Sequence, residues 1–191
     1  GHLAAGQWLL VTAVSSGVGV AALQTAKALG ARVIGTSGSA EKLARLEKAG
    51  LDVGIRTRTG DFHDAVMKAT DGKGVNLVVN NVGGSVFAEC LRSMAYEGRL
   101  ATVGHMDRVL SATIDLEALH RNRLTVFGVS NRFRVAARAE TVREFVRDIL
   151  PHFDAGRVRP LVDKVFALDE LAAALEFMES DQQVGKIVVR T

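Results

Sequence analysis

The sequence is poor in the residues that build disulfide-stapled domains or metal centres. Its 191 residues include one cysteine, two prolines and five histidines. The lone thiol, Cys90, can form neither a disulfide within the chain nor a four-ligand zinc site, so we expect it to pack in the interior. The histidines are scattered without metal-ligand spacing, and no metal is therefore expected.

Long apolar runs are also missing. No stretch reaches the length of a membrane span, and we recognise no secretory leader. We therefore expect a soluble, cytoplasmic protein without a membrane partner.

Positive charge is in small excess over negative charge. The net charge is +3 and the calculated pI is about 9.3. A nucleic-acid surface would need a recognition motif or interleaved aromatic residues, and neither is present. A solvated helix face or an anionic cofactor explains the charge more simply, so nucleic acid is not expected as a partner. The most basic stretch contains Arg132, Arg134, Arg138 and Arg143.

What the chain does contain is a strand–turn–helix–strand pattern near its start. Residues 8–11 form an apolar run that suits a strand buried on both faces of a parallel sheet. Residues 18–29 have helical spacing, and residues 32–36 form the next strand. In this βαβ unit the helix N-terminus points at a phosphate group.

The turn of this unit is the first candidate binding site. Gly17 would let the backbone approach a pyrophosphate, and Gly19 would let the helix pack closely on the strand. The G-x-G-x-x-G fingerprint is incomplete, because Val14 and Ser16 occupy its first two glycine places. An ordinary tight turn is the alternative, but a second strand follows the helix at the spacing expected of a βαβ unit, and this favours a nucleotide site. Its residues would be Ser16, Gly17, Val18 and Gly19.

The end of the second strand predicts the form of the nucleotide. NAD sites usually place Asp or Glu here to bind the ribose 2′-hydroxyl, and this chain has Ser37 instead. Without a carboxylate a 2′-phosphate is not repelled, which argues for NADPH over NADH. The alternative is that Ser39 is only a helix N-cap and Lys42 a solvated residue. The candidate 2′-phosphate residues are Ser37, Gly38, Ser39 and Lys42, with Arg56 and Arg58 as further charge nearby.

The rest of the chain predicts an α/β fold with a doubly wound parallel (Rossmann) sheet in residues 1–159 and a strand–helix–strand appendage in residues 160–191. We expect Asp61 to cap a helix that runs to about residue 70. Other expected strands are 53–56, 75–80, 99–104, 124–129, 162–166 and 184–190. Other expected helices are 40–49, 85–96 (ended by Gly98), 115–121 and 169–179, with Leu171, Leu175 and Met178 facing inward. A long amphipathic helix is also expected to end at Gly156, with one face formed by Val142, Phe145, Val146, Ile149 and Phe153.

Two families share parts of this pattern. The turn and residues 80–83 resemble short-chain dehydrogenases, whose chemistry needs a tyrosine followed four residues later by lysine. The only tyrosine is Tyr96, and Leu100 stands four places on. A broader likeness is to medium-chain dehydrogenases/reductases, closest to zinc-free quinone oxidoreductases and polyketide-type enoyl reductases. It is carried by residues 16–19, 26–31, 38–42, 82–84, 98–104, 156–160 and 184–189.

This resemblance implies hydride transfer from NADPH to a quinone or another conjugated carbonyl. It also implies a homodimer formed through the sixth strand, and a separate N-terminal substrate domain toward which the appendage would pack. His105 would be the one candidate proton donor, unless it only lines the crevice and solvent supplies the proton. Alternatives are an enoyl reductase domain of a synthase-type system, or a dinucleotide- or nucleic-acid-binding module without catalysis. Beyond the turn and the 2′-phosphate residues, the implied cofactor contacts are Asn81, Val82, Gly104, His105, Gly128, Val129 and Lys186.

Overall fold

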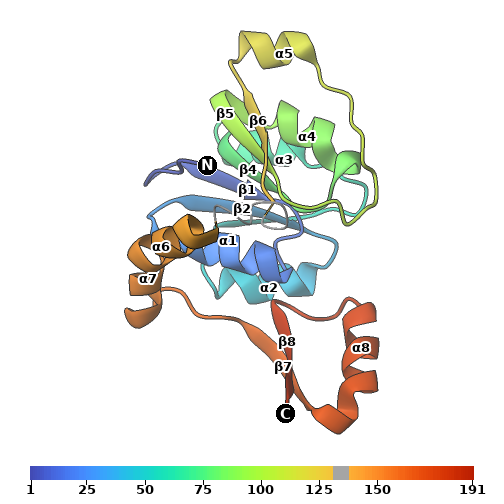
Figure 1. Ribbon diagram of the computed structural model, residues 1–191. Coiled ribbons are helices and arrows are strands. Elements are labelled where there is room, and N and C mark those ends of the chain that lie inside the picture. Colours follow the sequence, from blue (N-terminus) through green and yellow to red (C-terminus); the bar gives the residue numbers. More distant parts are fainter. Residues whose placement is uncertain (131–137) are drawn as a thin grey trace.

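The computed structural model describes residues 1–130 and 138–191. Its centre is a six-stranded parallel sheet with the strand order β3-β2-β1-β4-β5-β6 (Figure 1). The order reverses at β1, as in doubly wound dinucleotide-binding folds. The predicted fold class is confirmed. The strands are β1 (Trp8–Val11), β2 (Arg32–Ser37), β3 (Val53–Arg56), β4 (Val75–Asn80), β5 (Met94–Thr102) and β6 (Thr125–Gly128).

Helices cover the two faces of this sheet, and the strand residues alternate between them (Figure 1). Leu10 packs in the cluster that contains helix α3 (His63–Ala69) and α4 (Phe87–Arg92). Leu9 and Val11 pack in the opposite cluster, with α1 (Gly17–Ala28) and α2 (Ala40–Glu47). Every residue of β1 is buried, because both faces are covered. The predicted doubly buried strand is therefore observed.

Cys90 lies in the α3/α4 cluster and is fully buried. Burial raises the pKa of its thiol to about 12. The thiol therefore acts as a small apolar group, as predicted.

The helix expected at residues 85–96 is shorter than predicted. A 3₁₀ turn, η1 (Gly84–Val86), precedes α4, and β5 already begins at Met94. The Ser93 hydroxyl donates to the Glu89 carbonyl at 2.7 Å and closes the helix. Gly98, expected to end the helix, lies within β5 beside Glu97, which has a φ of 58°. The register between β4 and β5 shifts here, so the extra residues form a bulge.

The expected cap at Asp61 is also wrong. Helix α3 begins after Phe62, without a local side-chain cap. The backbone N–H groups of Phe62 and His63 donate to Glu89 Oε2 at 3.1 and 2.8 Å. The Glu89 carboxylate of α4 therefore accepts the hydrogen bonds that an N-cap side chain would accept. This tertiary contact cannot be predicted from the sequence around α3.

The predicted long amphipathic helix is divided in two. Helix α6 (Arg138–Asp148) is followed by α7 (Leu150–Asp154), where Pro151 lacks the N–H that would continue the helix. Val142, Phe145 and Val146, which were predicted to share the apolar face of this helix, are exposed to solvent. Upstream, α5 (Leu116–Arg121) is capped by Asp115. Arg132 and Arg134 lie outside the described residues.

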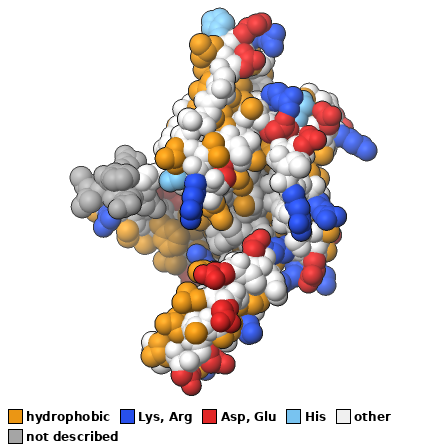
Figure 2. Space-filling model, turned by 90° about the vertical axis from the view of Figure 1, so that its right-hand side faces the viewer, with side chains coloured by type: hydrophobic (Ala, Val, Ile, Leu, Met, Phe, Trp, Pro, Cys, Tyr) orange, Lys and Arg blue, Asp and Glu red, His pale blue; other side chains and the backbone are white. Residues whose placement is uncertain are grey.

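The C-terminal residues form the predicted appendage, which projects from the sheet body (Figure 1). Strands β7 (Val162–Ala167) and β8 (Lys186–Arg190) pair in parallel and are joined by η3 (Leu168–Glu170) and α8 (Leu171–Glu179). Ala174 is the buried residue of α8. Leu171, Leu175 and Met178 were predicted to face inward and are instead about half exposed. Figure 2 shows hydrophobic side chains gathered on this lower part of the molecule.

The appendage is anchored to the sheet body through Val184. This side chain is fully buried in the α1/α2 cluster, and Leu161 packs against the same cluster. The Gly185 N–H donates to the Ser15 carbonyl at 2.9 Å. Within residues 1–130 and 138–191, no helix is long and apolar enough to cross a membrane.

Candidate functional site

The turn between β1 and α1 lies where the strand order reverses. Ser16 is the N-cap of α1, and its Oγ accepts a hydrogen bond from the Gly19 N–H at 3.0 Å. A Cβ on Gly19 would lie 2.5 Å from the Val14 carbonyl oxygen, so only glycine fits this approach of helix to strand. The predicted role of Gly19 in close packing is confirmed.

Val14, which fills the first fingerprint place, does not obstruct the turn. Its side chain is fully buried against β2, where a Cβ on Gly35 would lie 2.5 Å from Val14 Cγ1. A glycine at the first fingerprint place would leave room in the turn. Here the room for the Val14 side chain comes from Gly35 of the neighbouring strand β2, which has no side chain. Sequence reasoning missed Gly35, because its partner is on another element.

A cation lies directly over this turn. A Cβ placed on Gly17 would be 2.6 Å from Nζ of Lys186, the first residue of β8. The ammonium group and the positive end of α1 therefore share one place, which suits an anionic group. The structure brings Lys186 next to Ser16–Gly19, although about 170 residues of chain separate them.

The candidate 2′-phosphate residues also lie together. Ser37 Oγ accepts from the Ser39 N–H at 3.3 Å, and Ser39 Oγ accepts from the Lys42 N–H at 3.3 Å. Ser39 is thus the N-cap of α2, as the alternative interpretation expected. The Arg58 Nε–H donates to the Gly38 carbonyl at 3.4 Å and places a guanidinium group beside this loop.

Lys42 is not the solvated residue of that alternative. Its side chain is 8% exposed, and its Nζ lies 2.7 Å from Asp181 Oδ1. The carboxylate belongs to the turn after α8, in the appendage. Sequence reasoning missed this contact, because nothing in the local sequence of either residue indicates the other.

The end of β4 is held by a buried hydrogen-bond network. Asn80 Oδ1 accepts from the Thr12 hydroxyl at 3.1 Å and from the N–H groups of Val82 and Gly83, while Asn80 Nδ2 donates to the Gly83 carbonyl at 2.9 Å. An aspartate here could accept but not donate. Asn81 Nδ2 donates to the Thr12 carbonyl at 3.1 Å, so this predicted cofactor residue directs its side chain inward.

A cavity of about 930 Å³ opens at the carboxyl ends of β4, β5 and β6. It contains four predicted cofactor residues, and the remaining lining includes Phe87, Val109, Leu110 and Ile114. An apolar cavity with few polar groups suits a planar organic ring. The four predicted residues are Gly104, His105, Gly128 and Val129.

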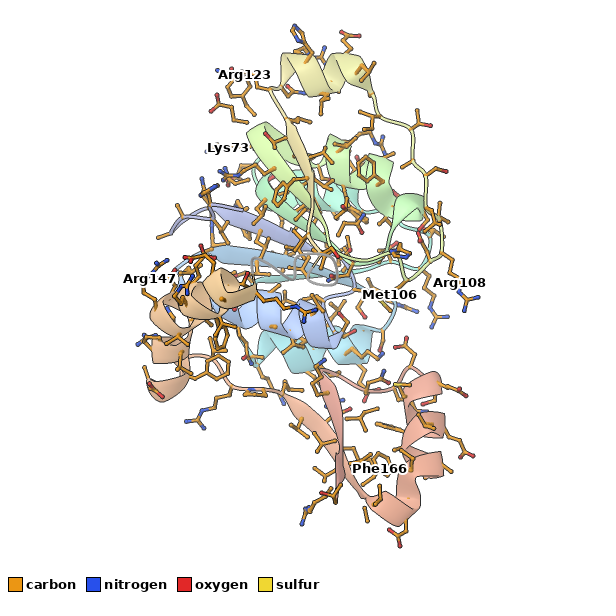
Figure 3. The ribbon with its side chains drawn as sticks, in the orientation of Figure 1. Lys73, Met106, Arg108, Arg123, Arg147 and Phe166 are labelled. Carbon is orange, nitrogen blue, oxygen red and sulfur yellow. The ribbon has the colours of Figure 1, made fainter. Side chains whose placement is uncertain are left out.

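The loop that forms one wall of this cavity is held by Asp107. Its Oδ2 accepts from the Ser85 N–H at 2.8 Å and its Oδ1 accepts from the Val109 N–H at 2.9 Å. Desolvation acts to raise the pKa of Asp107, but the hydrogen bonds from Ser85 and Val109 lower it overall. Met106 and Arg108, which are labelled in Figure 3, are exposed residues of this loop. His105 is exposed at the cavity rim.

The predicted residues therefore form three groups along one side of the sheet. Ser16–Gly19 lie with Lys186, the residues 37–42 lie with Arg58, and the third group lines the cavity. Asn81 and Val82 stand between the first and third groups, joined to β1 through Thr12. In the part of the chain that the structure describes, no three His, Cys, Asp or Glu residues are arranged to hold a metal ion.

Fold and site together define a dinucleotide-binding domain of the doubly wound class. The sequence profile of the zinc-binding dehydrogenase family matches residues 17–148. The chain belongs to this family, as a cofactor-binding domain of the zinc-free medium-chain type. The predicted resemblance is confirmed.

Relatives include large synthases and stand-alone proteins. The chain is 31% identical over 198 residues to polyketide synthase 37 of Dictyostelium discoideum, covering 99% of this chain and 6% of the relative. It is also 31% identical over 189 residues to quinone oxidoreductase-like protein 2 of Bos taurus, covering 96% of this chain and 53% of the relative. The chain thus spans about half of one relative and a small part of the other.

Solved structures share the whole fold. The CurK enoyl reductase has a TM-score of 0.80 and 28% identity, over 97% of this chain and 55% of that chain. Mycobacterial Rv1454c, solved in complex with NADPH, has a TM-score of 0.84 and 26% identity, over 100% of this chain and 59% of that chain.

Proposed function

We propose that the chain is the cofactor-binding part of an oxidoreductase that transfers hydride from NADPH to a conjugated carbonyl, either a quinone or an enoyl thioester. One observation carries this proposal. The Lys186 ammonium and the N-terminus of α1 converge on Gly17 at the reversal point of the sheet. That is where a pyrophosphate rests in doubly wound folds.

The residues present fit a nicotinamide dinucleotide along its length. Gly17 and Gly19 keep the turn free of side chains, and Lys186 adds charge for the pyrophosphate. The adenosine end would meet Ser37, Gly38 and Lys42, and the nicotinamide end would enter the 930 Å³ cavity. A bound reduced nicotinamide supplies the hydride, and this chain's apolar cavity wall would orient the ring and exclude water.

The comparisons support both substrate classes. One relative is a quinone oxidoreductase-like protein, and one neighbour is an enoyl reductase. Here Asp107 holds the cavity loop, and His105 at the rim is the candidate proton donor. The substrate would bind partly to a domain outside this chain, since the chain spans about half of the quinone oxidoreductase-like relative.

Further parts of the proposal concern assembly. The edge strand β6 would pair with a second copy, which would cover Val126 and Phe127. The division at residue 159 would separate the dinucleotide-binding domain from an appendage that packs toward the substrate domain. The half-exposed Leu171, Leu175 and Met178 would then be covered by that domain.

The binding proposal is tested by titrating the chain with NADPH and NADH, followed by nicotinamide fluorescence. Lys186→Gln should weaken both nucleotides by about tenfold, because the pyrophosphate is common to them. Lys164→Gln is the matched control: its ammonium lies over the rings of Phe166 and Phe177 at 4.6 and 5.2 Å, away from the turn. It should leave both affinities unchanged.

The titration also separates the alternatives. Failure of both nucleotides to bind would contradict the oxidoreductase proposal. Salt-dependent binding of a labelled RNA, unaffected by NADPH, would favour a module without catalysis.

A further inference from the structure

The turn after α8 carries a carboxylate into the candidate 2′-phosphate site. Asp181 Oδ1 lies 2.7 Å from Lys42 Nζ, and the two residues are 139 positions apart. The Lys42 side chain is 8% exposed and that of Asp181 is 88% exposed. The lysine is therefore fixed and enclosed, whereas the aspartate reaches it from the surface.

The position of Asp181 gives little local reason for a carboxylate. Its φ is 49°, in the left-handed region, where glycine and asparagine are at least as well suited. It also directly follows Ser180, the C-cap of α8, where the helix dipole disfavours negative charge. The observed contact of this carboxylate is the ion pair with Lys42.

The pair changes the charge that a 2′-phosphate would meet. Lys42 and Asp181 together are close to neutral, so the enclosed lysine no longer offers a full positive charge. The second cation at this loop is Arg58, which is exposed and lies at the Gly38 carbonyl. An arriving phosphate dianion would have to share or displace the Asp181 carboxylate.

We propose that Asp181 sets the cofactor specificity of this site by competing with the 2′-phosphate for Lys42. The inference rests on the proposed NADPH site and adds a determinant from the appendage. Because Asp181 is 88% exposed, its carboxylate can turn to water when the phosphate binds. The site then accepts NADPH with a smaller preference over NADH than Ser37, Ser39 and Lys42 alone would give.

Asp181→Asn tests the proposal with little disturbance. Asparagine has the same shape, tolerates a positive φ and removes only the charge. NADPH should bind about threefold to fivefold more tightly to this variant, near the upper end of the range for surface ion pairs because Lys42 is enclosed, and NADH should bind unchanged. Asp169→Asn, in η3 of the same appendage, removes the same charge away from Lys42 and should change neither affinity.

A double-mutant cycle distinguishes direct competition for Lys42 from a long-range electrostatic effect of the Asp181 charge on the nucleotide. In the Lys42→Gln background, Asp181→Asn should lose most of its effect on NADPH, because the residue competed for is gone. An equal gain with NADH, an equal gain from Asp169→Asn, or an effect that survives Lys42→Gln would each overturn the inference. An unchanged NADPH affinity in Asp181→Asn would overturn it while the cofactor proposal stood. Failure of wild type and variants to bind either nucleotide would overturn both.

Discussion

The buried hydroxyl of Thr12 should contribute strongly to the free energy of unfolding. Thr12 is fully buried at the end of β1, where its Oγ1 accepts from the Asn81 N–H at 2.9 Å and donates to Asn80 Oδ1 at 3.1 Å. Thr12→Val keeps the shape and removes the hydroxyl. Asn80 Oδ1 keeps two other donors, but the Asn81 N–H loses its acceptor. A buried donor without a partner costs about 1–3 kcal/mol.

We therefore expect Thr12→Val to lower the free energy of unfolding by about 2 kcal/mol. For a chain of this length, that corresponds to a fall in Tm of about 4–8 °C. Thr12→Ser is the matched control: it keeps the hydroxyl, loses one methyl group and should cost about 1 kcal/mol. Urea denaturation followed by circular dichroism measures both. If volume alone decided the outcome, serine would cost more than valine, and that order would refute the reasoning.

Two further predictions concern Asp163 of β7, which forms an ion pair with Arg45 of α2, and the buried thiol. Desolvation acts to raise the pKa of Asp163, but hydrogen bonds from Arg45 and the Val184 N–H hold it below the ordinary 3.8. Because the folded pKa is the lower one, the stabilisation is complete above the ordinary pKa and is lost as the pH falls toward the folded one. Urea midpoints measured below about pH 4 should fall less steeply in Asp163→Asn than in wild type, and equal slopes would contradict this. Burial raises the pKa of Cys90 to about 12, so a thiol reagent at pH 8 should label it only after unfolding in urea. Rapid labelling of the native chain would show that the thiol is accessible.

The sheet could be predicted from the sequence because its signals are local. Residues 8–11 are uniformly apolar, and the turn that follows contains Gly17 and Gly19 in the order that a βα unit needs. The same holds for Asp115, whose side chain accepts from the Ala118 N–H and caps α5 as its position suggests. Each of these elements is specified by residues that are neighbours in the chain.

The wrong predictions share another cause. Asp61 was expected to cap α3, but Glu89 from another helix binds the free N–H groups. Gly98 was expected to end a helix, but pairing of Met94 with Val75 begins the strand earlier. In both cases a tertiary contact overrides a reasonable local signal. Burial of Leu171 was predicted from periodicity alone, and periodicity gives the apolar face without saying what covers it.

The appendage contributes more to the candidate site than its position at the end of the chain suggests. Its first contact places Lys186 over the glycine turn, and its second places Asp181 on Lys42. In the proposed site, one of these charges would favour the pyrophosphate that all nicotinamide dinucleotides share, and the other would oppose the phosphate that distinguishes NADPH. Affinity and specificity would then be set partly by the same short segment, residues 181–186. A change in how this segment docks on α1 and α2 would alter both together, whereas a substitution at Ser37 or Ser39 would alter specificity alone.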